Sequence, residues 1–264
     1  MTSAFKDDLL AGKTAFVAGG TSGINLGIAK RFAALGAKVA VVGRNPEKAA
    51  NAAREIGGGA LGLSADVREY GAIRGAMEQV AQAFGPLDIV VSGAAGNFLA
   101  PANGMSANAF RTVVDIDLNG TFNVFRGCYD LLRRPGASLI AITAGQAVNA
   151  IPLQIHACAA KAGINQVIRV LAMEWGPDVR VNGISPGPIA NTEGMSRLAP
   201  DPATREAHYA RIAMGRWGEV DEVAECAVFL SSPSASYISG TILDCDGGSQ
   251  LGDASRRNLG TGLA

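Results

Sequence analysis

Histidine and cysteine are both scarce in this chain, and each scarcity excludes a kind of site. His156 and His208 are the only histidines, so a metal site built mainly from histidine is impossible, and we predict no metal centre. The four cysteines are far apart and form no C-x-x-C pair, which is typical of buried thiols in a reducing compartment. Apolar runs stay shorter than the roughly 18 residues that a membrane span needs, so we expect no membrane partner.

The chain also has no excess of positive or negative charge. Lys plus Arg and Asp plus Glu number 23 each, and a net charge of zero gives no long-range attraction to nucleic acid or anionic lipid. The start of the chain has no basic segment followed by an apolar one, and the final Thr-Gly-Leu-Ala is not a peroxisomal address of the Ser-Lys-Leu type. We therefore expect a cytoplasmic protein whose partners are small molecules and copies of itself.

Short, continuously apolar segments alternate with segments of helical spacing along the chain. Strands that are apolar throughout are buried on both faces, which indicates a parallel sheet covered by helices. Strands are expected at 14–18, 38–42, 61–64, 87–91, 138–143, 180–184 and 241–243, and helices at 28–35, 46–56, 70–84, 108–132, 158–175 and 220–230. The alternation predicts one α/β domain with a doubly wound parallel sheet, the Rossmann fold, over residues 1–264.

Residues 189–216 break this alternation. They form a polar segment punctuated by proline, and they follow a strand at the edge where α/β sheets bind ligands. We interpret them as a mobile segment that covers the substrate. The alternative is a structural excursion that caps the core.

A glycine-rich run follows the first expected strand and opens the first helix. It reads GGTSGINLGIA from Gly19, so the backbone can approach a pyrophosphate, and the helix N-terminus offers it free N–H groups and a partial positive charge. Asn25 stands where a third glycine is usual, and its β-carbon is expected to crowd the phosphates slightly. The cofactor-binding residues predicted from this run are Gly19, Thr21, Ser22, Gly23, Asn25 and Leu26.

The end of the second strand indicates which dinucleotide binds. A site for NAD places Asp or Glu there to bind the ribose 2′-hydroxyl, whereas this chain has Gly43 and then Arg44. An arginine suits a 2′-phosphate, so we predict NADP(H) as the cofactor; the alternative is a solvent-exposed arginine. Asp66-Val67, after the third strand, is expected to flank the adenine, and Ala94-Ala95-Gly96 follows the fourth strand with side chains small enough to admit the nucleotide.

Together with further motifs, these elements resemble the short-chain dehydrogenase/reductase family over nearly the whole chain. The further motifs are Lys161, Ser185-Pro186-Gly187-Pro188-Ile189 and the closing GTILDCDGG from Gly240. The resemblance implies a Rossmann fold and an oxidoreductase with a nicotinamide cofactor. It also implies that Lys161, Pro186, Gly187 and Ile189 contact that cofactor.

The catalytic positions depart from the family pattern. The family uses Asn, Ser, Tyr and Lys, the last two as Y-x-x-x-K, and only Lys161 remains here. Asp117 stands in the Asn position, Ala144 in the Ser position and Ala157 in the Tyr position. A carbonyl reductase needs a phenol, with its pKa lowered by the lysine, to protonate the alkoxide. This chain cannot supply one at that place.

The 2,4-dienoyl-CoA reductases are a branch of the family that tolerates this loss, and the chain resembles their peroxisomal type. The similar stretches are AAGNF from Ala94, Asp115-Ile116-Asp117, His156-Ala157, and Pro186-Gly187-Pro188-Ile189 followed by Thr192-Glu193-Gly194. The mitochondrial type has a catalytic Tyr fifteen residues before the Lys, where this chain has Gln146. The resemblance therefore implies NADPH-dependent reduction of 2,4-dienoyl-CoA thioesters, an auxiliary step of unsaturated fatty acid β-oxidation.

Dienoyl chemistry explains how a reduction can proceed without a phenol. Hydride adds to the distal carbon of the conjugated system, charge spreads to the thioester oxygen as a dienolate, and no strongly basic alkoxide forms. Lys161 is expected to hold the nicotinamide ribose and to stabilise the dienolate. Asp117 has two open catalytic roles, pairing with Lys161 or positioning a water as the proton source. The alternative is a helix aspartate that bonds only locally.

Five side chains are candidates for contact with the substrate. Asn97 is expected near the thioester or carboxamide region and Phe98 along the acyl channel, with loop packing as the alternative. Thr143 and Gln146 are weaker candidates. His156 is a candidate donor to the substrate, against the alternative of a hydrogen-bonded structural histidine. The resemblance also implies a homotetramer built on the helices that contain residues 122–132 and 164–173.

Two other functions remain open at this point. One is a short-chain reductase of the same fold that acts on another enone or carbonyl compound. The other is a non-catalytic NADP(H)-binding protein, which Ala144 and Ala157 favour, while the retained Lys161 and the intact cofactor motif argue against it.

Overall fold

A sheet of seven parallel strands forms the centre of the computed structural model, which describes residues 5–192, 195, 199 and 201–256. The strand order is β3-β2-β1-β4-β5-β6-β7, so the direction of winding reverses between β1 and β4. The strands are β1 (Thr14–Ala18), β2 (Lys38–Gly43), β3 (Leu61–Ser64), β4 (Ile89–Ser92), β5 (Ala137–Ile142), β6 (Val179–Pro186) and β7 (Ile242–Cys245). The predicted single α/β domain with a doubly wound sheet is confirmed.

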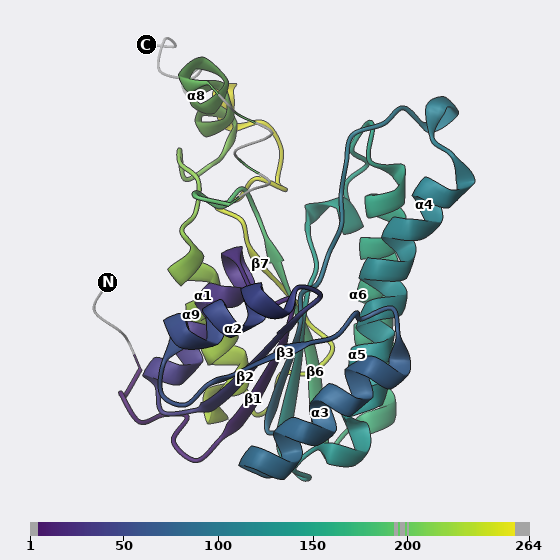
Figure 1. Ribbon diagram of the computed structural model, residues 1–264. Helices are drawn as coiled ribbons and strands as arrows, with labels where there is room; N and C mark the ends of the chain where they lie inside the picture. Colours follow the sequence, from purple (N-terminus) through teal and green to yellow (C-terminus); the bar gives the residue numbers. More distant parts are fainter. Residues whose placement is uncertain (1–4, 193–194, 196–198, 200, 257–264) are drawn as a thin grey trace.

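Helices cover both faces of the sheet (Figure 1). One layer consists of α1 (Gly23–Ala34), α2 (Pro46–Ile56) and α9 (Val220–Ser231), and the other of α3 (Tyr70–Phe84), α5 (Gly120–Cys128) and α6 (Ile155–Trp175). A further helix, α4 (Ala107–Val114), packs on α6. None of the helices in the described part of the chain is both long and apolar enough to cross a membrane.

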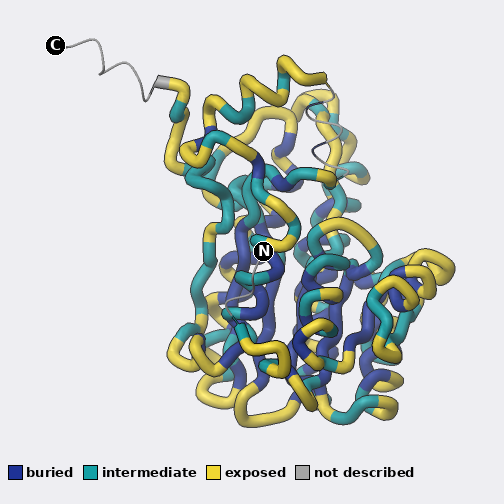
Figure 2. The backbone as a smooth tube through the Cα atoms, turned by 90° about the vertical axis from the view of Figure 1, so that its left-hand side faces the viewer, coloured by how far each residue is buried: buried dark blue, intermediate teal, exposed yellow. Residues whose placement is uncertain are grey.

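The strands are apolar on both faces because each face meets a helical layer. Phe16 and Val90 pack toward α3, α5 and α6, whereas their neighbours Val17 and Val91 pack toward α1 and α9. This alternation follows from the period of two residues along a strand. Each such side chain contributes about 1.5–3 kcal/mol when fully buried. Figure 2 shows the buried strands inside a shell of more exposed helices and loops.

Two helices near the expected site differ from the sequence prediction. The helix expected at 108–132 is α4 followed by a π-helical turn (Asp115–Asn119), α5 and a 3-10 turn (Tyr129–Leu131). Helix α6 begins at Ile155, before the expected position 158, so Gln154 is its N-cap residue. Both differences change which side chains face the carboxyl edge of the sheet.

The segment predicted to cover the substrate contains a helix, α8 (Pro202–Arg211), that was not predicted from the sequence. Asp201 caps it by accepting a hydrogen bond from Thr204 N at 2.9 Å, and proline at its first turn is a common helix start. A small apolar cluster separate from the two main cores, with Ile212 and Trp217 among its members, anchors the segment. In Figure 1, α8 stands above the sheet, near the C-terminal end of the described chain. Positions 193, 194, 196–198 and 200 of the predicted cover lie outside the described residues.

Candidate active site

A cleft of about 340 Å³ lies at the carboxyl ends of β1, β2, β3 and β4, next to the point where the strand order reverses. Ligands of open α/β sheets bind at this position. The cleft is lined by Gly19, Thr21, Ser22, Asn25, Val42, Gly43, Arg44, Ala65, Asp66, Val67, Gly93, Ala94, Ala95 and Ile116. Most of the residues predicted to bind the cofactor are thus brought together in one place.

The glycine-rich loop fits a dinucleotide phosphate. Gly19 has a φ of +77°, and a β-carbon there would lie 2.6 Å from Ala94 N, so only glycine lets this loop approach β4 so closely. Gly23, at the start of α1, has a φ of +54°, and a β-carbon there would meet no atom within 4 Å. Ser22 makes no side-chain capping bond, which leaves the first N–H groups of α1 for a ligand.

Asn25 has a role that the sequence did not predict. Its Nδ2 donates a hydrogen bond of 2.8 Å to Gly93 O, and a β-carbon on Gly93 would clash with the Asn25 carboxamide. Asn25 therefore ties the glycine-rich loop to the end of β4. Asn25 also lines the cleft, so the expected crowding of the phosphates by its β-carbon stays a prediction.

Three charged side chains lie at the end of the cleft formed by β2 and β3. Arg44 is exposed and lines the cleft, and Gly43 before it leaves space for Thr21. Arg68 donates hydrogen bonds from Nε and Nη2 to Asp66 Oδ2, and the distance from Nη2 to Oδ2 is 2.6 Å. The Arg68 hydrogen bonds lower the pKa of Asp66, and the Arg44 charge acts weakly in the same direction. A second guanidinium therefore stands beside the predicted adenosine site.

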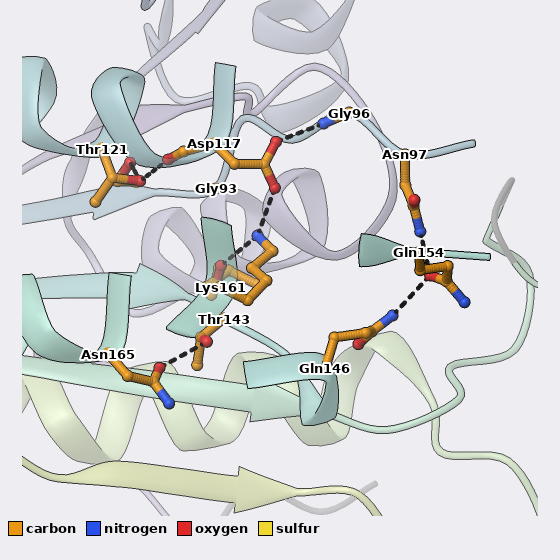
Figure 3. Close-up of polar contacts among 12 residues, drawn as sticks. Gly93, Gly96, Asn97, Asp117, Thr121, Thr143, Gln146, Gln154, Lys161 and Asn165 are labelled. Carbon is orange, nitrogen blue, oxygen red and sulfur yellow. Dashed lines mark hydrogen bonds and ion pairs between the residues drawn. The ribbon is translucent and has the colours of Figure 1, made fainter. Parts of the chain in front are cut away.

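Lys161 and Asp117 form a buried ion pair (Figure 3). Lys161 Nζ lies 3.1 Å from Asp117 Oδ2 and donates a hydrogen bond of 3.1 Å to Ile142 O. Asp117 Oδ1 accepts a hydrogen bond of 2.7 Å from Gly96 N. The side chains of Lys161 and Asp117 are only 10% and 1% exposed. Pairing with Lys161, one of the roles left open for Asp117, is thus present in the structure.

The π-helical turn sets the direction in which Asp117 projects. Such turns are rare, and they are frequent at functional sites. Thr121 Oγ1 donates a 2.6 Å hydrogen bond to Asp117 O, and Ser92 Oγ donates to Thr121 Oγ1 at 3.1 Å. These two hydroxyls fasten the widened turn to the end of β4.

Three amide side chains meet beside the ion pair. Asn97 Nδ2 donates to Gln154 Oε1 at 2.6 Å, and Gln146 Nε2 donates to the same oxygen at 3.3 Å (Figure 3). Thr143, another predicted substrate contact, donates its hydroxyl to Asn165 Oδ1 at 2.7 Å and is buried. Asn97 and Gln146 therefore share a partner that the sequence did not identify.

His156 is fully buried, and its ring centre lies 4.3 Å from that of Phe98. Neither ring nitrogen makes a well-formed hydrogen bond within the described residues. Burial lowers the pKa of His156, while the charge of Asp117 and the backbone of Phe98 act in the opposite direction. The ring also packs against Phe98, and both roles considered for His156, a donor to the substrate or a structural histidine, stay predictions.

The remaining residues predicted to contact the cofactor line other surfaces. Leu26 packs against the core beside α1 and α9, Pro186 ends β6, and Ile189 is buried with only 3% of its surface exposed. Gly187 lies so close to Asp246 that a β-carbon there would be 2.6 Å from its Cα. Pro186, Gly187 and Ile189 lie where β6 continues into the covering segment, whereas Leu26 lies in α1. Their contacts with the cofactor stay predictions.

Two polar residues of the site were not found from the sequence. Arg68 follows Asp66 by two positions, a spacing with no recognised signature. Gln154 precedes Ala157 and Lys161 by three and seven residues, which places all three on one helix face. This spacing can identify Gln154 from the sequence, provided that the predicted helix begins early enough to include position 154.

Comparisons with known proteins agree with this geometry. A family model described as enoyl-(acyl carrier protein) reductase matches residues 18–250. A peroxisomal 2,4-dienoyl-CoA reductase of Rattus norvegicus, named as (3E)-enoyl-CoA-producing, is 43% identical over 94% of this chain and 87% of its own. A probable 2,4-dienoyl-CoA reductase of Bacillus subtilis, named as (2E)-enoyl-CoA-producing, is 35% identical over 90% of this chain and 97% of its own.

A solved structure is similar as well. The crystal structure of a short-chain dehydrogenase from Bacillus anthracis superposes with a TM-score of 0.81 at 37% identity. The match covers 91% of this chain and 97% of that one.

The ion pair gives a stability prediction. Removing one partner leaves the other charge buried, so Asp117→Asn and Lys161→Met are each expected to lower the free energy of unfolding by about 3–5 kcal/mol. The double variant is expected to lose less than the sum, with a coupling of about 0.5–3 kcal/mol, because no unpaired ion remains. Urea unfolding of the four proteins measures the coupling, and simple additivity would contradict the pairing.

Proposed function

The chain belongs to the short-chain dehydrogenase/reductase family, and from that premise we propose that it reduces the conjugated double bonds of 2,4-dienoyl-CoA thioesters with NADPH. Relatives that are 43% and 35% identical over most of both chains are named 2,4-dienoyl-CoA reductases, which confirms the predicted oxidoreductase acting on CH–CH bonds. The observation that carries the proposal is a buried Lys161–Asp117 pair in a site where positions 144 and 157 are alanine.

The absence of a phenol suits this reaction better than the reduction of a ketone. A ketone accepts hydride to give a basic alkoxide, which needs a well-placed proton donor. A dienoyl thioester accepts hydride at its δ-carbon, and the charge spreads over a dienolate that hydrogen bonds and a cation can stabilise. A site with an ammonium group and amides is therefore sufficient for the dienoyl substrate.

A nicotinamide cofactor follows from the family, and we propose NADP(H) in particular. The reduced nicotinamide supplies the hydride when it is bound. Arg44 lines the cleft at the end of β2, and no carboxylate stands there to bind a ribose 2′-hydroxyl. Arg68 also lies at this end of the cleft, where Asp66 balances its charge. The charge of Arg44 supports a 2′-phosphate.

Lys161 is proposed to orient the nicotinamide ribose. An ammonium has three N–H groups, and Asp117 and Ile142 O accept two of them. The third N–H is left to donate to a ribose hydroxyl and to stabilise the dienolate through its charge.

We propose that Asp117 accepts a hydrogen bond from a water molecule as well as from Lys161. Within the described part of the chain each of its oxygens has one partner, Gly96 N or Lys161 Nζ, and a carboxylate oxygen can accept a second hydrogen bond. The water held there would deliver the proton. We propose delivery to the α-carbon, which moves the double bond and gives a 3-enoyl-CoA, as the name of the more similar relative states.

The acyl group is proposed to lie between the ends of β4 and β5 and the covering segment. Phe98 is 40% exposed and lies in the loop after β4, so it is suited to line the acyl chain. Asn97, Thr143, Gln146 and His156 remain proposed substrate contacts. Residues 189–216, to which α8 belongs, are proposed to cover the bound thioester.

Assembly and location are also proposals. The face of α5 and α6 carries exposed apolar side chains, among them Phe122 and Met173 at 48% and 85% exposed, which supports a homotetramer built on these helices. The cytoplasm is the compartment proposed from the sequence, although the rat relative is named as peroxisomal.

The direct test of the function is a spectrophotometric assay with 2,4-hexadienoyl-CoA and 2,4-decadienoyl-CoA. We expect loss of the dienoyl absorbance with equal oxidation of NADPH, and a 3-enoyl-CoA as the product. A panel of enones and ketones serves as the control for another reductase activity. Tight NADPH binding without turnover of either dienoyl-CoA would reject the proposal.

The cofactor choice is tested with Arg44→Ala. Losing a charged hydrogen bond to the 2′-phosphate costs about 1.5–3 kcal/mol, so NADPH affinity should fall by about 10- to 100-fold. NADH affinity should change little, because NADH has no 2′-phosphate. Equal losses for the two cofactors in fluorescence titrations would refute the assignment.

The tetramer is tested by sedimentation of the purified chain. We expect a tetramer for the wild type and smaller species for Met173→Glu, because a charge would be buried at the interface. A wild-type chain that sediments as a monomer at micromolar concentration would contradict the proposed assembly.

A further inference from the structure

Gln154 is held in a fixed orientation by its neighbours. Its Oε1 accepts hydrogen bonds from Asn97 Nδ2 at 2.6 Å and from Gln146 Nε2 at 3.3 Å. With Oε1 accepting from both partners, the nitrogen of the same carboxamide points the other way. Figure 3 shows this nitrogen directed away from both partners.

The nitrogen of Gln154 is an unused donor at a mostly buried position. The residue is 7% exposed, and nothing in residues 5–192, 195, 199 and 201–256 accepts a hydrogen bond from Nε2. The atom is not among the fully buried polar atoms that lack a partner, so it keeps some contact with solvent. Gln154 is the N-cap residue of α6, yet its side chain makes no capping bond. Its donors are thus available for a ligand.

The backbone before Gln154 is strained in a way that fixes its position. Leu153 has a φ of +65°, a region that bulky residues rarely adopt. The Leu153 carbonyl accepts a hydrogen bond of 3.0 Å from Ala100 N, in the loop that carries Asn97. The two loops are therefore clamped together by one backbone bond and one side-chain bond. Strain of this kind persists where the surroundings over-determine it, and it clusters at functional sites.

Gln154 also lies on the face of α6 that carries the catalytic positions. Ala157 and Lys161 follow it by three and seven residues, so the three share one side of the helix. Ala157 has only a methyl group where the family places the phenol. Gln154 therefore precedes that methyl by about one helical turn.

We propose that Gln154 donates a hydrogen bond to the thioester oxygen of the substrate and stabilises the negative charge that develops there. This inference rests on the proposed dienoyl-CoA reductase function. In the step concerned, bound NADPH would break its C4–H bond and become NADP⁺, and the hydride would form a C–H bond at the δ-carbon while the π electrons move toward the thioester oxygen. A water would then give a proton to the α-carbon, and the hydroxide left behind would take up a proton from solvent. Gln154 keeps its protons throughout and contributes only the hydrogen bond. Besides their proposed contacts with the substrate, Asn97 and Gln146 position Gln154, because they hold its oxygen.

The test compares Gln154→Glu with Gln154→Ala. A glutamate still accepts from Asn97 and Gln146, but it turns a charged acceptor toward the thioester oxygen instead of a donor. Loss of one such donor lowers kcat by about 10²- to 10³-fold, and we expect at least this loss for both variants. NADPH affinity should remain at the wild-type value in both, which shows an intact cofactor site. Gln79→Glu, on the exposed face of α3, introduces the same charge change and should retain full activity.

A purely structural Gln154 gives a different result. Gln154→Glu would then turn over like the wild type, because both of its hydrogen bonds are kept, and that outcome would overturn the proposal. A donor role further predicts that the activity of Gln154→Glu, relative to the wild type, rises as pH falls and the carboxyl gains a proton that it can donate. The relative activity of Gln154→Ala should not change with pH.

A spectroscopic measurement keeps the proposal testable if Gln154→Glu does not fold. In a complex with NADP⁺ and 2,4-hexadienoyl-CoA, the wild type should shift the infrared stretch of the thioester carbonyl to lower frequency, and Gln154→Ala should lose part of this shift. An identical frequency in both proteins would overturn the assignment. A wild type that reduces no dienoyl-CoA would instead reject the proposed function itself, so the two failures are distinguishable.

Discussion

The salt bridge between Lys161 and Asp117 is the contact on which the rest of the site depends. Burying two ions costs several kcal/mol each, and their attraction offsets this only when further hydrogen bonds complete the pair. Here the amide of Gly96 and the carbonyl of Ile142 complete it, at 2.7 and 3.1 Å. These groups follow β4 and end β5, so the pair joins α6, the π-helical turn and two strand ends at a single point. The framework of the fold therefore brings this charge to the edge of the sheet.

The chemistry of the site follows from the groups around this ion pair and from the hydroxyl groups that positions 144 and 157 do not supply. Alanine at positions 144 and 157 removes the hydroxyl groups with which the family reduces ketones, while the lysine that orients the cofactor remains. When hydride adds to the δ-carbon, the negative charge spreads to the thioester oxygen. Stabilising this charge matters more for the rate than a strong acid does. An ammonium, a water beside a carboxylate and an oriented carboxamide can provide that stabilisation together.

Much of this arrangement could be predicted from the sequence, because it rests on local signals. Apolar runs and glycine-rich turns predicted the sheet, and the spacing of Asp117 and Lys161 to the family motifs predicted two residues that meet in space. The π-helical turn has no sequence signature, so a continuous helix was expected there. Gln154 was missed because the start of α6 was placed three residues late, and helix ends are the least certain part of such a prediction. The link from Asn25 to Gly93 depends on the approach of two loops, which no local pattern encodes.

A crystal structure of the chain with NADP⁺ and 2,4-hexadienoyl-CoA would test the role of the ion pair directly. We expect Lys161 Nζ to hydrogen bond to a hydroxyl of the nicotinamide ribose while it keeps its contact with Asp117. We also expect polar groups of the protein to surround the thioester oxygen. A Lys161 side chain turned away from the nicotinamide, with no polar group facing the ring, would contradict this role.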